Sequence, residues 1–475
     1  MDEKRNLLAQ IEELNESNEK LQYLLNISKS MMSEIELDTL LQVIMEKVTH
    51  VMDADRSTLF LLDKKTNELW SKVAQGANIN EIRFPNGMGI AGHVAAQGEI
   101  INIQDAYGDE RFNQEIDKKT GYRTKSILTM PLKNSKGEII GATQVLNKKS
   151  GNGWFNQNDE DLLEAFSSLA AISLENAIVY QQVHNTMKTF ELFVPPKYLQ
   201  RIAKEGLESI KLGNAEKIHA TVVFSDIRSF TDLSETMTPD ESLEFLNSYL
   251  NEMGNIIAKN DGFIDKFIGD AIMAIYDHSS PDASIDTAIQ MRKQLDIFNE
   301  NRINKNETPI EIGIGINTGE VIVGTIGSND RMDSTVIGDT VNLASRMEGL
   351  TKIYKCRVLI CDNTLEKLEN AEKYCIREID TVKVKGKKIN TTVYEIYDYE
   401  DENTKELKKK INPLLIKGRE LYRVRKWDEA IEQFREALEA SPDDIVPFIF
   451  MDRCKKYKTL PPPDNWDGAY KLEEK

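Results

Sequence analysis

Residues 262–276 read GFIDKFIGDAIMAIY, and this stretch decides the architecture of the second half of the chain. Its apolar runs flank a turn at Ile268-Gly269, which is typical of a buried β-hairpin. A hairpin that only filled a core would not need Lys266 and Asp270, four residues apart. The stretch therefore predicts a hairpin that contributes functional side chains as well as apolar residues to the core.

A second carboxylate ends another apolar run upstream. The run HATVVFSDIRSFT, residues 219–231, reaches Asp226 where its apolar part ends. Taken singly, Asp226 or Asp270 would be an ordinary acidic residue at a strand end. Two such carboxylates brought together could hold a pair of Mg²⁺ ions, which activate an attacking oxygen and neutralise a leaving phosphate. Periodicity alone does not bring them together.

Four motifs within residues 192–398 resemble, in chain order, the motifs of class III nucleotidyl cyclases. They read FSDIRSFTDLSE, DKFIGDAIMAIY, STVIGDTVNLASRME and VKVKGKK. The segment FVPPKYL, followed by IKLGNAEK, is similar to the lead-in of the cyanobacterial class IIIb adenylyl cyclases, which also carry tandem sensor domains. The resemblance implies a lead-in over 194–215 and a ferredoxin-like α/β catalytic domain over 216–400. Strand-like and helical stretches alternate there, as such a domain requires.

The resemblance also implies a homodimer whose active sites lie at the interface and are each built from both subunits. Two Mg²⁺ or Mn²⁺ ions per site would be held by Asp226, Asp270 and the backbone carbonyl of Ile227. One ion would lower the pKa of the ribose 3′-hydroxyl of ATP so that it attacks the α-phosphorus. The other would neutralise the triphosphate and the departing pyrophosphate, and the product would be cyclic AMP (cAMP).

Further family roles fall on residues near the third and fourth motifs. From the partner subunit, Asn342 would orient the ribose and Arg346 would stabilise the charge that develops on the α-phosphoryl group. Both lie in GDTVNLASR, so a helix starting near Asp339 would put them on one face. Lys385 matches a lysine that grips the terminal phosphates. However, TVKVKGKK also reads as an ordinary basic strand and turn, and Lys387 could substitute.

Two positions bear on the choice of base. Lys266 can donate to the N1 acceptor of adenine, and the hydroxyl of Thr335 can accept from the adenine amino group. Guanylyl cyclases of the family have a glutamate at the first place and usually a cysteine at the second, so these residues indicate ATP. The alternatives are a guanylyl cyclase, or a cyclic-nucleotide sensor with an inactive cyclase domain. A diguanylate cyclase would carry a Gly-Gly-Asp/Glu-Glu-Phe turn where this chain has Ile268-Gly269-Asp270.

The stretch before the cyclase motifs predicts an α+β domain with an antiparallel sheet, from strand-like runs such as STLFLLD and SILTMPLK. It resembles the GAF domains of cyclic-nucleotide phosphodiesterases and of the cyanobacterial cyclases, over about residues 36–180. The family's nucleotide-binding signature is intact as Asn147, Lys148, Phe155, Asp159 and Glu160. In the family these five stabilise the pocket more than they touch the ligand, and the Lys148–Asp159 pair would latch the lid.

The resemblance places direct ligand contacts on seven small, apolar or polar side chains. They are Thr58, Ile90, Ala91, Asp117, Thr120, Thr124 and Gln144. Each of them could equally serve ordinary packing of sheet and loop. Gln75 and Asn113 replace an aspartate and an aromatic residue of the phosphodiesterases, which leaves cAMP or cGMP open as the GAF ligand. We prefer cAMP, because a cAMP-binding regulator ahead of a cAMP-making domain would give positive feedback.

Heptad spacing flanks the GAF domain on both sides. Residues 1–35 and 161–193 each carry an apolar seam, with Asn18 and Asn176 at polar positions, and this pattern predicts parallel dimerising helices. The alternative for the first is an amphipathic helix packed on its own domain. Residues 411–460 resemble a tetratricopeptide (TPR) unit, and 461–475 read as a disordered or loosely docked tail. Since one such unit cannot bury its apolar face alone, it would dock on the cyclase domain, pair with its twin or receive a protein partner.

Composition limits the partners. The 78 acidic and 60 basic residues give a net charge of −18, which argues against nucleic acid. The charged N-terminus lacks a signal peptide core and no apolar run approaches the length of a membrane span, so we expect a cytoplasmic protein without membrane insertion. The four cysteines and five histidines form no metal-binding or catalytic spacing, and we interpret them as structural.

Overall fold

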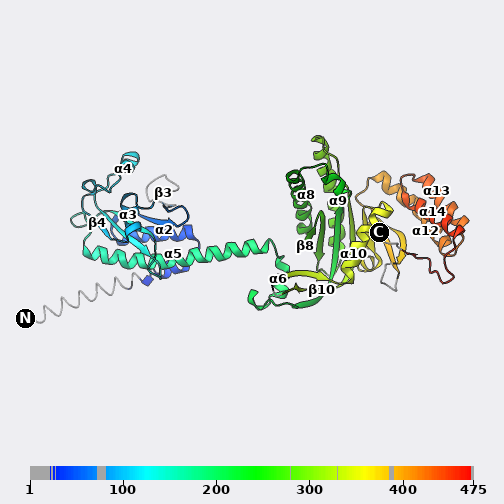
Figure 1. Cartoon of the computed structure of the whole chain (residues 1–475), viewed down its shortest axis with the longest axis horizontal. Helices are drawn as coiled ribbons and strands as arrows, with labels where there is room; N and C mark the ends of the chain where they lie inside the picture. Colours follow the sequence, from blue (N-terminus) through cyan, green and yellow to red (C-terminus); the bar gives the residue numbers. More distant parts are fainter. Residues whose placement is uncertain are drawn as a thin grey trace, which may run out of the picture. The chain divides into compact units, whose positions relative to one another are not determined.

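The computed structural model describes residues 22, 25–26, 28–71, 82–278, 280–328, 330–383 and 390–471, apart from the side chains of Ile116, Lys119 and Thr120. The chain divides into two compact units, Met1–Phe190 and Glu191–Lys475 (Figure 1). The part of the heptad seam predicted before residue 25 lies outside the described residues.

The first unit is built on a six-stranded antiparallel sheet in the order β3-β2-β1-β6-β5-β4, as the strand-like runs predicted. Its strands are β1 (Ala54–Asp63), β2 (Glu68–Ser71), β3 (Ile82–Pro85), β4 (Ile101–Ile103), β5 (Ile127–Lys133) and β6 (Ile139–Lys148). Because side chains alternate along a strand, Leu59 and Leu61 face one layer of helices and Phe60 faces the other.

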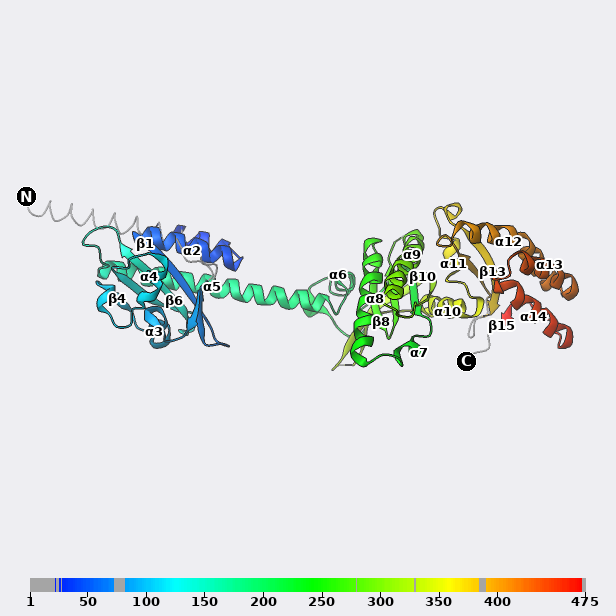
Figure 2. The same cartoon turned by 90° about the horizontal axis from the view of Figure 1, so that it is seen from above.

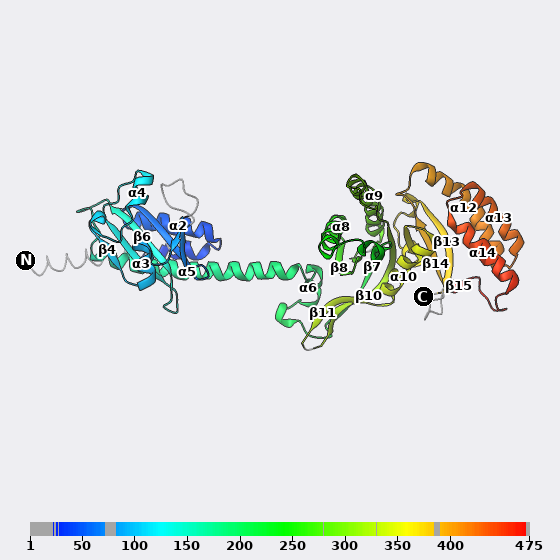
Figure 3. The same cartoon turned by 45° about the horizontal axis from the view of Figure 1, so that its top comes forward.

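Helices cover both faces of this sheet (Figure 3). On one face, α2 (Leu37–Val51) and α5 (Gln157–Glu191) share a core with Leu59 and Leu61. On the other face lie α3 (Gly89–Gln97), the short helix η1 (Ala106–Gly108) and α4 (Gln114–Thr120). The sheet is therefore the middle layer of three.

Helix α5 has two apolar stripes. Its core stripe includes Leu163, Phe166 and Leu174, which are buried against the sheet. The predicted heptad seam is a different stripe, and its members Val179 and Val183 are 51% and 63% exposed. Among the described residues α5 is also the one helix long and apolar enough to cross a membrane, which the sequence did not predict. Since its core stripe is buried in the first unit, this is weak evidence for a span.

The second unit is built on a nine-stranded sheet in the order β15-β13-β14-β12-β10-β7-β9-β8, with β11 paired to the far part of β10. Its strands are β7 (Ala215–Ile227), β8 (Phe263–Ile268), β9 (Ala271–Tyr276), β10 (Ile312–Gly327), β11 (Met332–Ile337), β12 (Val358–Cys361), β13 (Ile376–Lys383), β14 (Thr391–Ile396) and β15 (Tyr470–Lys471). The pairs β10–β12 and β13–β15 are parallel and the others are antiparallel.

Alternation along β9 explains why the opening stretch is apolar on both sides. Ile272 and Ala274 pack toward α8 (Pro239–Lys259) and α9 (Asp282–Asn304), two helices that lie side by side in Figure 2. Met273 and Ile275 pack on the opposite face. That opposite face also receives α6 (Pro196–Ile202) and α10 (Asp339–Tyr354). The short helices α7 (Phe230–Ser234), α11 (Asp362–Leu365), η2 (Leu207–Ser209) and η3 (Ala371–Lys373) complete the unit before residue 400.

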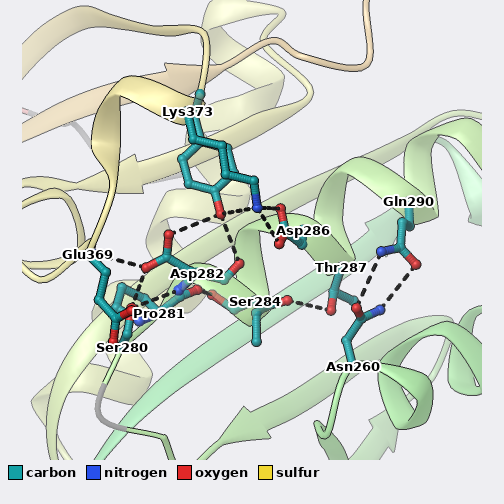
Figure 4. Close-up of polar contacts among 12 residues, drawn as sticks. Asn260, Ser280, Pro281, Asp282, Ser284, Asp286, Thr287, Gln290, Glu369 and Lys373 are labelled. Carbon is teal, nitrogen blue, oxygen red and sulfur yellow. Dashed lines mark hydrogen bonds and ion pairs between the residues drawn. The ribbon is translucent and has the colours of Figure 1, made fainter.

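Polar contacts fix the first turn of α9 to the segment that leads into β13 (Figure 4). The Asp282 carboxylate accepts a hydrogen bond from the backbone N–H of Glu369 at 3.0 Å. Lys373 Nζ lies 2.7 Å from Asp286 Oδ2, one turn further along α9. These contacts connect α9 to the segment that leads into β13.

The C-terminal helices dock on the sheet of the same unit. They are α12 (Glu402–Arg423), α13 (Trp427–Ala440) and α14 (Ile445–Thr459). Their apolar faces form one core with α10, β12, β13 and β14, which is the first of the three arrangements left open by the sequence. Gly418 allows α12 and α13 to approach closely, since a Cβ there would lie 2.6 Å from the ring of Phe434. The resemblance to a tetratricopeptide unit itself stays a prediction.

Buried ion pairs complete this docking surface. Arg453 Nη1 lies 2.5 Å from Asp380 Oδ2, and Arg377 pairs with both Glu395 and Asp444. The tail is ordered as far as residue 471, because Trp466 joins the core and β15 pairs with β13. Of the two states predicted for the tail, disordered or loosely docked, the structure has residues 461–471 docked on this sheet.

Candidate active site and ligand pocket

The two predicted metal-binding carboxylates lie at one edge of the second sheet. Strand β9 runs antiparallel to β7 with Ile272 opposite Ser225, so the turn before β9 lies beside the end of β7. Gly269 enters this turn with φ of 64°, a conformation that favours glycine. The backbone N–H of Ile227 donates to Asp270 Oδ2 at 3.2 Å, so Asp270 lies against the residue that follows Asp226.

Electrostatics at this edge fit a divalent cation. The pKa of Asp270 is raised from 3.8 to about 6, because the carboxyl is partly buried and the negative charge of Asp226 lies beside it. Two repelling carboxylates are hard oxygen donors of the kind that Mg²⁺ and Mn²⁺ prefer. Among the residues that the structure describes, no group of three or more His, Cys, Asp or Glu forms a metal site, so further ligands would come from backbone and substrate oxygens.

A lysine that the sequence reasoning missed also reaches this edge. Lys352 Nζ lies 3.1 Å from Asp226 Oδ2, and one helical turn earlier Glu348 accepts from Arg228 at 2.7 Å. Arg228 also donates to Thr351. The signal in the sequence was the spacing of Glu348 and Lys352, four apart on a helix that was already predicted.

The predicted phosphate and ribose residues lie on the other half of the same helix. Helix α10 begins at Asp339, as expected, and carries Asn342 and Arg346 one turn apart. Asn342 is exposed and Arg346 is half-buried. The contacts with the carboxylate edge described above come from the C-terminal half of α10. Lys385 and Lys387 lie outside the described residues.

The two predicted base-reading residues come together around a buried carboxylate. Thr335 lies on β11 and its hydroxyl donates to Asp265 Oδ2 at 3.3 Å. Lys266 Nζ lies 3.7 Å from the same oxygen and 3.6 Å from Asp333 Oδ2. Asp265 also accepts from the hydroxyl of Tyr198 on α6. The sequence reasoning missed Asp265 and Tyr198, although the three-residue string Asp265-Lys266-Phe267 was within the quoted motif.

A groove lies beside this cluster. It has a volume of 680 Å³, and its walls include Pro195, Phe263, Lys266 and Asp333. Residues within 191–196, which lead into α6, and strand β8 therefore contribute to the walls of the same groove. Lys266 is 32% exposed and available to a ligand, whereas the side chain of Asp265 is fully buried.

The GAF signature residues form a clamp at one end of the first sheet. Lys148 Nζ lies 2.9 Å from Asp159 Oδ1 and donates to the backbone oxygen of Met52, so β6, α5 and the end of α2 are joined. Phe155 is buried in the core beneath them. Glu160 accepts from Asn102 at 2.8 Å, and this links α5 to β4.

Asn147 holds the loop that follows α4. Its side-chain oxygen accepts from the N–H of Lys125 at 2.6 Å, and its amide donates to the oxygen of Arg123 and the hydroxyl of Tyr122, both at 2.9 Å. Asn147 has φ of 57°, which Asn tolerates better than most residues. The five signature residues thus contact backbone and neighbouring side chains of the first unit, and their role around a ligand stays a prediction.

Of the seven residues predicted to contact the GAF ligand, six have described side chains and that of Thr120 is not described. Asp117 accepts from both the N–H and the hydroxyl of Thr124, at 2.7 and 2.9 Å, and from Tyr107. Thr58 and Gln144 are cross-strand partners on β1 and β6. Ile90 and Ala91 belong to α3, and their side chains are buried in the core between this helix and the sheet. Asn113 caps α4, and Gln75 lies outside the described residues.

Two family models match this chain. Residues 214–397 match the adenylate and guanylate cyclase catalytic domain, and residues 36–174 match the GAF domain. These ranges fall within the second and first unit respectively.

Three curated proteins are similar to parts of it. An adenylate cyclase of Anabaena cylindrica is 45% identical over 235 residues, 48% of this chain and 47% of that protein. The terminal-differentiation specific adenylate cyclase of Dictyostelium discoideum is 39% identical over 286 residues, 59% of this chain and 13% of that protein. The dual 3′,5′-cyclic-AMP and -GMP phosphodiesterase 11A of Takifugu rubripes is 40% identical over 178 residues, 35% of this chain and 20% of that protein. The chain therefore covers less than half of each of these relatives.

Proposed function

Because this chain combines a GAF domain with an adenylate and guanylate cyclase catalytic domain, we propose that it is an adenylyl cyclase. It converts ATP to 3′,5′-cyclic AMP and pyrophosphate in the second unit. The observation that carries the proposal has two parts: Asp226 and Asp270 lie together where β7 ends and β9 begins, and Lys266 of β8 and Thr335 of β11 meet at Asp265. The first pair suits a metal–triphosphate, and the second suits an adenine base.

The metal ligands in this proposal are Asp226, Asp270 and the carbonyl of Ile227. Two Mg²⁺ or Mn²⁺ ions bound there supply Lewis acidity toward the ribose hydroxyl and the phosphates. The chain's own part is to hold the two carboxylates fixed, since Asp270 is tied to the N–H of Ile227 and Asp226 lies at the end of a buried strand. Asn342 orients the ribose and Arg346 balances charge on the α-phosphoryl group.

The active unit in this proposal is a parallel homodimer. Two observations support it. The predicted heptad seam of α5 is exposed beside a separate buried stripe, which leaves it available to a second copy. In addition, the carboxylate edge is contacted by the C-terminal half of α10, so that Asn342 and Arg346 of a second subunit can complete the site from the opposite side. Helix pairing through α5 is the route by which the GAF domain acts on catalysis.

The GAF domain binds a cyclic nucleotide in this proposal, with cAMP preferred. Similarity of residues 36–174 to the GAF family and the latch between Lys148 and Asp159 support a pocket closed by a held loop. We also infer a cytoplasmic location, where ATP is available and thiols stay reduced, in agreement with four free cysteines.

The direct test is turnover by the purified full chain with Mn²⁺ and either ATP or GTP, each with and without cAMP or cGMP. We expect cAMP from ATP and stimulation by one of the cyclic nucleotides. If the protein formed no cAMP from ATP, the proposal would be contradicted. Production of cGMP from GTP alone would favour the guanylyl cyclase alternative. A Lys266→Glu, Thr335→Cys double variant is expected to gain GTP turnover, since both changes reverse the hydrogen-bonding pattern toward guanine.

A further inference from the structure

We propose that Asp265 is a positioning residue that fixes the Thr335 hydroxyl as a hydrogen-bond acceptor toward the nucleotide base, and that Tyr198 holds Asp265 in place. This inference rests on the proposed adenylyl cyclase function and deepens it. It assigns the preference for ATP over GTP to a buried carboxylate that does not touch the substrate.

A β-bulge places Asp265 inside the protein. On β8, Ile264 lies opposite Ala274 and Lys266 lies opposite Met273, so Asp265 is the extra residue between two consecutive positions of β9. Bulges redirect side chains relative to the regular alternation of a strand. As a result, Asp265 is fully buried while Lys266, its neighbour, is 32% exposed at the groove.

Both carboxylate oxygens of Asp265 have defined donors. Oδ1 accepts from the Tyr198 hydroxyl and Oδ2 accepts from the Thr335 hydroxyl. Burial and the negative charge of Asp265 raise the pKa of Tyr198, so this phenol stays protonated and can only donate here. Burial also raises the pKa of Asp265. Three contacts oppose that rise because they favour the ionised carboxylate: the hydrogen bond from Tyr198, the charge of Lys266 and the hydrogen bond from Thr335.

A threonine hydroxyl has one hydrogen and two lone pairs. Since the hydrogen of Thr335 is committed to Asp265, only its lone pairs remain for a ligand. The amino group of adenine donates to such a lone pair, whereas the carbonyl oxygen of guanine would meet it as a second acceptor. A site built this way rejects the wrong base because polar atoms are left unpaired.

Tyr198 connects this device to the lead-in segment. It lies on α6, is 1% exposed, and packs edge-on against Phe263 at 5.3 Å between ring centroids. The base-reading hydroxyl is therefore two hydrogen bonds away from the first helix of the second unit. A displacement of α6 would loosen Asp265 and, through it, Thr335.

The test measures the ratio of kcat/KM for ATP to that for GTP in the purified full chain. Asp265→Asn keeps the size of the side chain, but its amide can donate to Thr335 and free the threonine hydrogen. We expect the ratio to fall about tenfold or more, mainly through KM. Tyr198→Phe, which removes one hydroxyl, should lower the ratio by a smaller factor, about threefold. Both variants are compared with the wild type by thermal melting, and Tyr198→Phe carries the test if Asp265→Asn does not fold.

A cycle of variants isolates the contact. Thr335→Val removes the hydroxyl, and Asp265→Asn should change the ratio no further in that background, whereas Thr335→Ser should retain the preference. Asp333→Asn is the matched control, because Asp333 also contacts Lys266 but is 63% exposed and lies on the groove. Equal losses with ATP and GTP in Asp265→Asn would overturn the positioning role, since a general structural defect lowers both. If the wild-type protein made no cAMP, the result would instead contradict the proposed adenylyl cyclase function, on which the inference rests.

Discussion

Lys352 Nζ lies 3.1 Å from Asp226 Oδ2, so a cation carried by α10 occupies one side of the carboxylate that is proposed to bind metal. The side chain of Lys352 is 54% exposed, and it can swing away at little cost. A divalent ion that binds Asp226 must therefore displace or coexist with this ammonium group.

Lys352→Met is expected to tighten Mn²⁺ binding about three- to tenfold, because the competing charge is removed and the apolar stem is kept. Calorimetric titration of the nucleotide-free protein with Mn²⁺ measures this without turnover. Lys293→Met, an exposed lysine on α9, is the matched control and should leave the affinity unchanged. Weaker Mn²⁺ binding in Lys352→Met would show that the lysine supports the metal site instead of competing with it.

Asp270→Asn is expected to stabilise the metal-free protein at neutral pH. The pKa of Asp270 is raised from 3.8 to about 6, so the folded state holds this proton more tightly than the unfolded chain does. Its contribution to the free energy of unfolding is therefore largest below about pH 4 and is lost as the pH rises through 6. At pH 7.5 the free energy of unfolding of Asp270→Asn should exceed that of the wild type by roughly 1 kcal/mol after solvent screening. This difference should vanish near pH 4.

Thermal melting in the presence of EDTA at both pH values measures this difference. Added Mn²⁺ should reverse the order at pH 7.5, because it stabilises the wild type and not Asp270→Asn. The same gain at both pH values would mean that the charge of Asp270 is not its cause.

Two inactive variants should restore one working site when they share a dimer. In the proposed homodimer, Asp270 serves the metals of one site and Lys266 reads the base in the other. Co-expressed Lys266→Ala and Asp270→Ala chains form about half heterodimers by random pairing, each with one intact site. The mixture should therefore show about a quarter of wild-type activity. Activity no higher than that of the separate variants would place both residues in the same site.

Lys148→Met is expected to weaken the GAF domain and its response to cyclic nucleotide. The Lys148–Asp159 pair is largely buried, and its loss leaves a carboxylate without its cation, at a cost of about 1–3 kcal/mol. Thermal melting and calorimetric titration with cAMP and cGMP measure the two effects. Lys149→Met is the neighbouring control, since Lys149 is exposed and should change neither quantity by much. Unchanged binding and stability in Lys148→Met would rule out a latch.

Arg453→Met is expected to undock the C-terminal helices from the cyclase sheet. Asp380 would remain buried without its partner, which costs about 3–5 kcal/mol. Lys458 lies on α14 like Arg453, and Lys458→Met removes an exposed ion pair with Asp428 of α13, which should cost less than about 0.5 kcal/mol. Limited proteolysis near residue 400, together with thermal melting, distinguishes the two. Equal behaviour of both variants would mean that the buried pair does not hold the helices.

Local patterns in the sequence predict many of the secondary-structure elements. The turn in GFIDKFIGDAIMAIY, the helix beginning at Asp339 and the antiparallel strands of the first unit follow from alternation, turn residues and helix starts, which act over a few residues. The resemblance to family motifs then assigned roles to Asp226, Asp270, Lys266 and Thr335 without any knowledge of their distances.

Tertiary structure alone decided what these residues touch. The bulge at Asp265, its bond to Thr335 from another strand and the reach of Lys352 to Asp226 join positions that are 70 and 126 residues apart. Such contacts depend on strand register and on the packing of α10 across β7, and the local periodicity of the sequence predicts neither. The ordered tail is a further example, because Trp466 and β15 become stable only on a sheet edge that forms elsewhere in the chain. Spacing and turn residues thus determined the local elements, and the family resemblance assigned their chemistry. Burial and strand register determined which residues each charged side chain contacts.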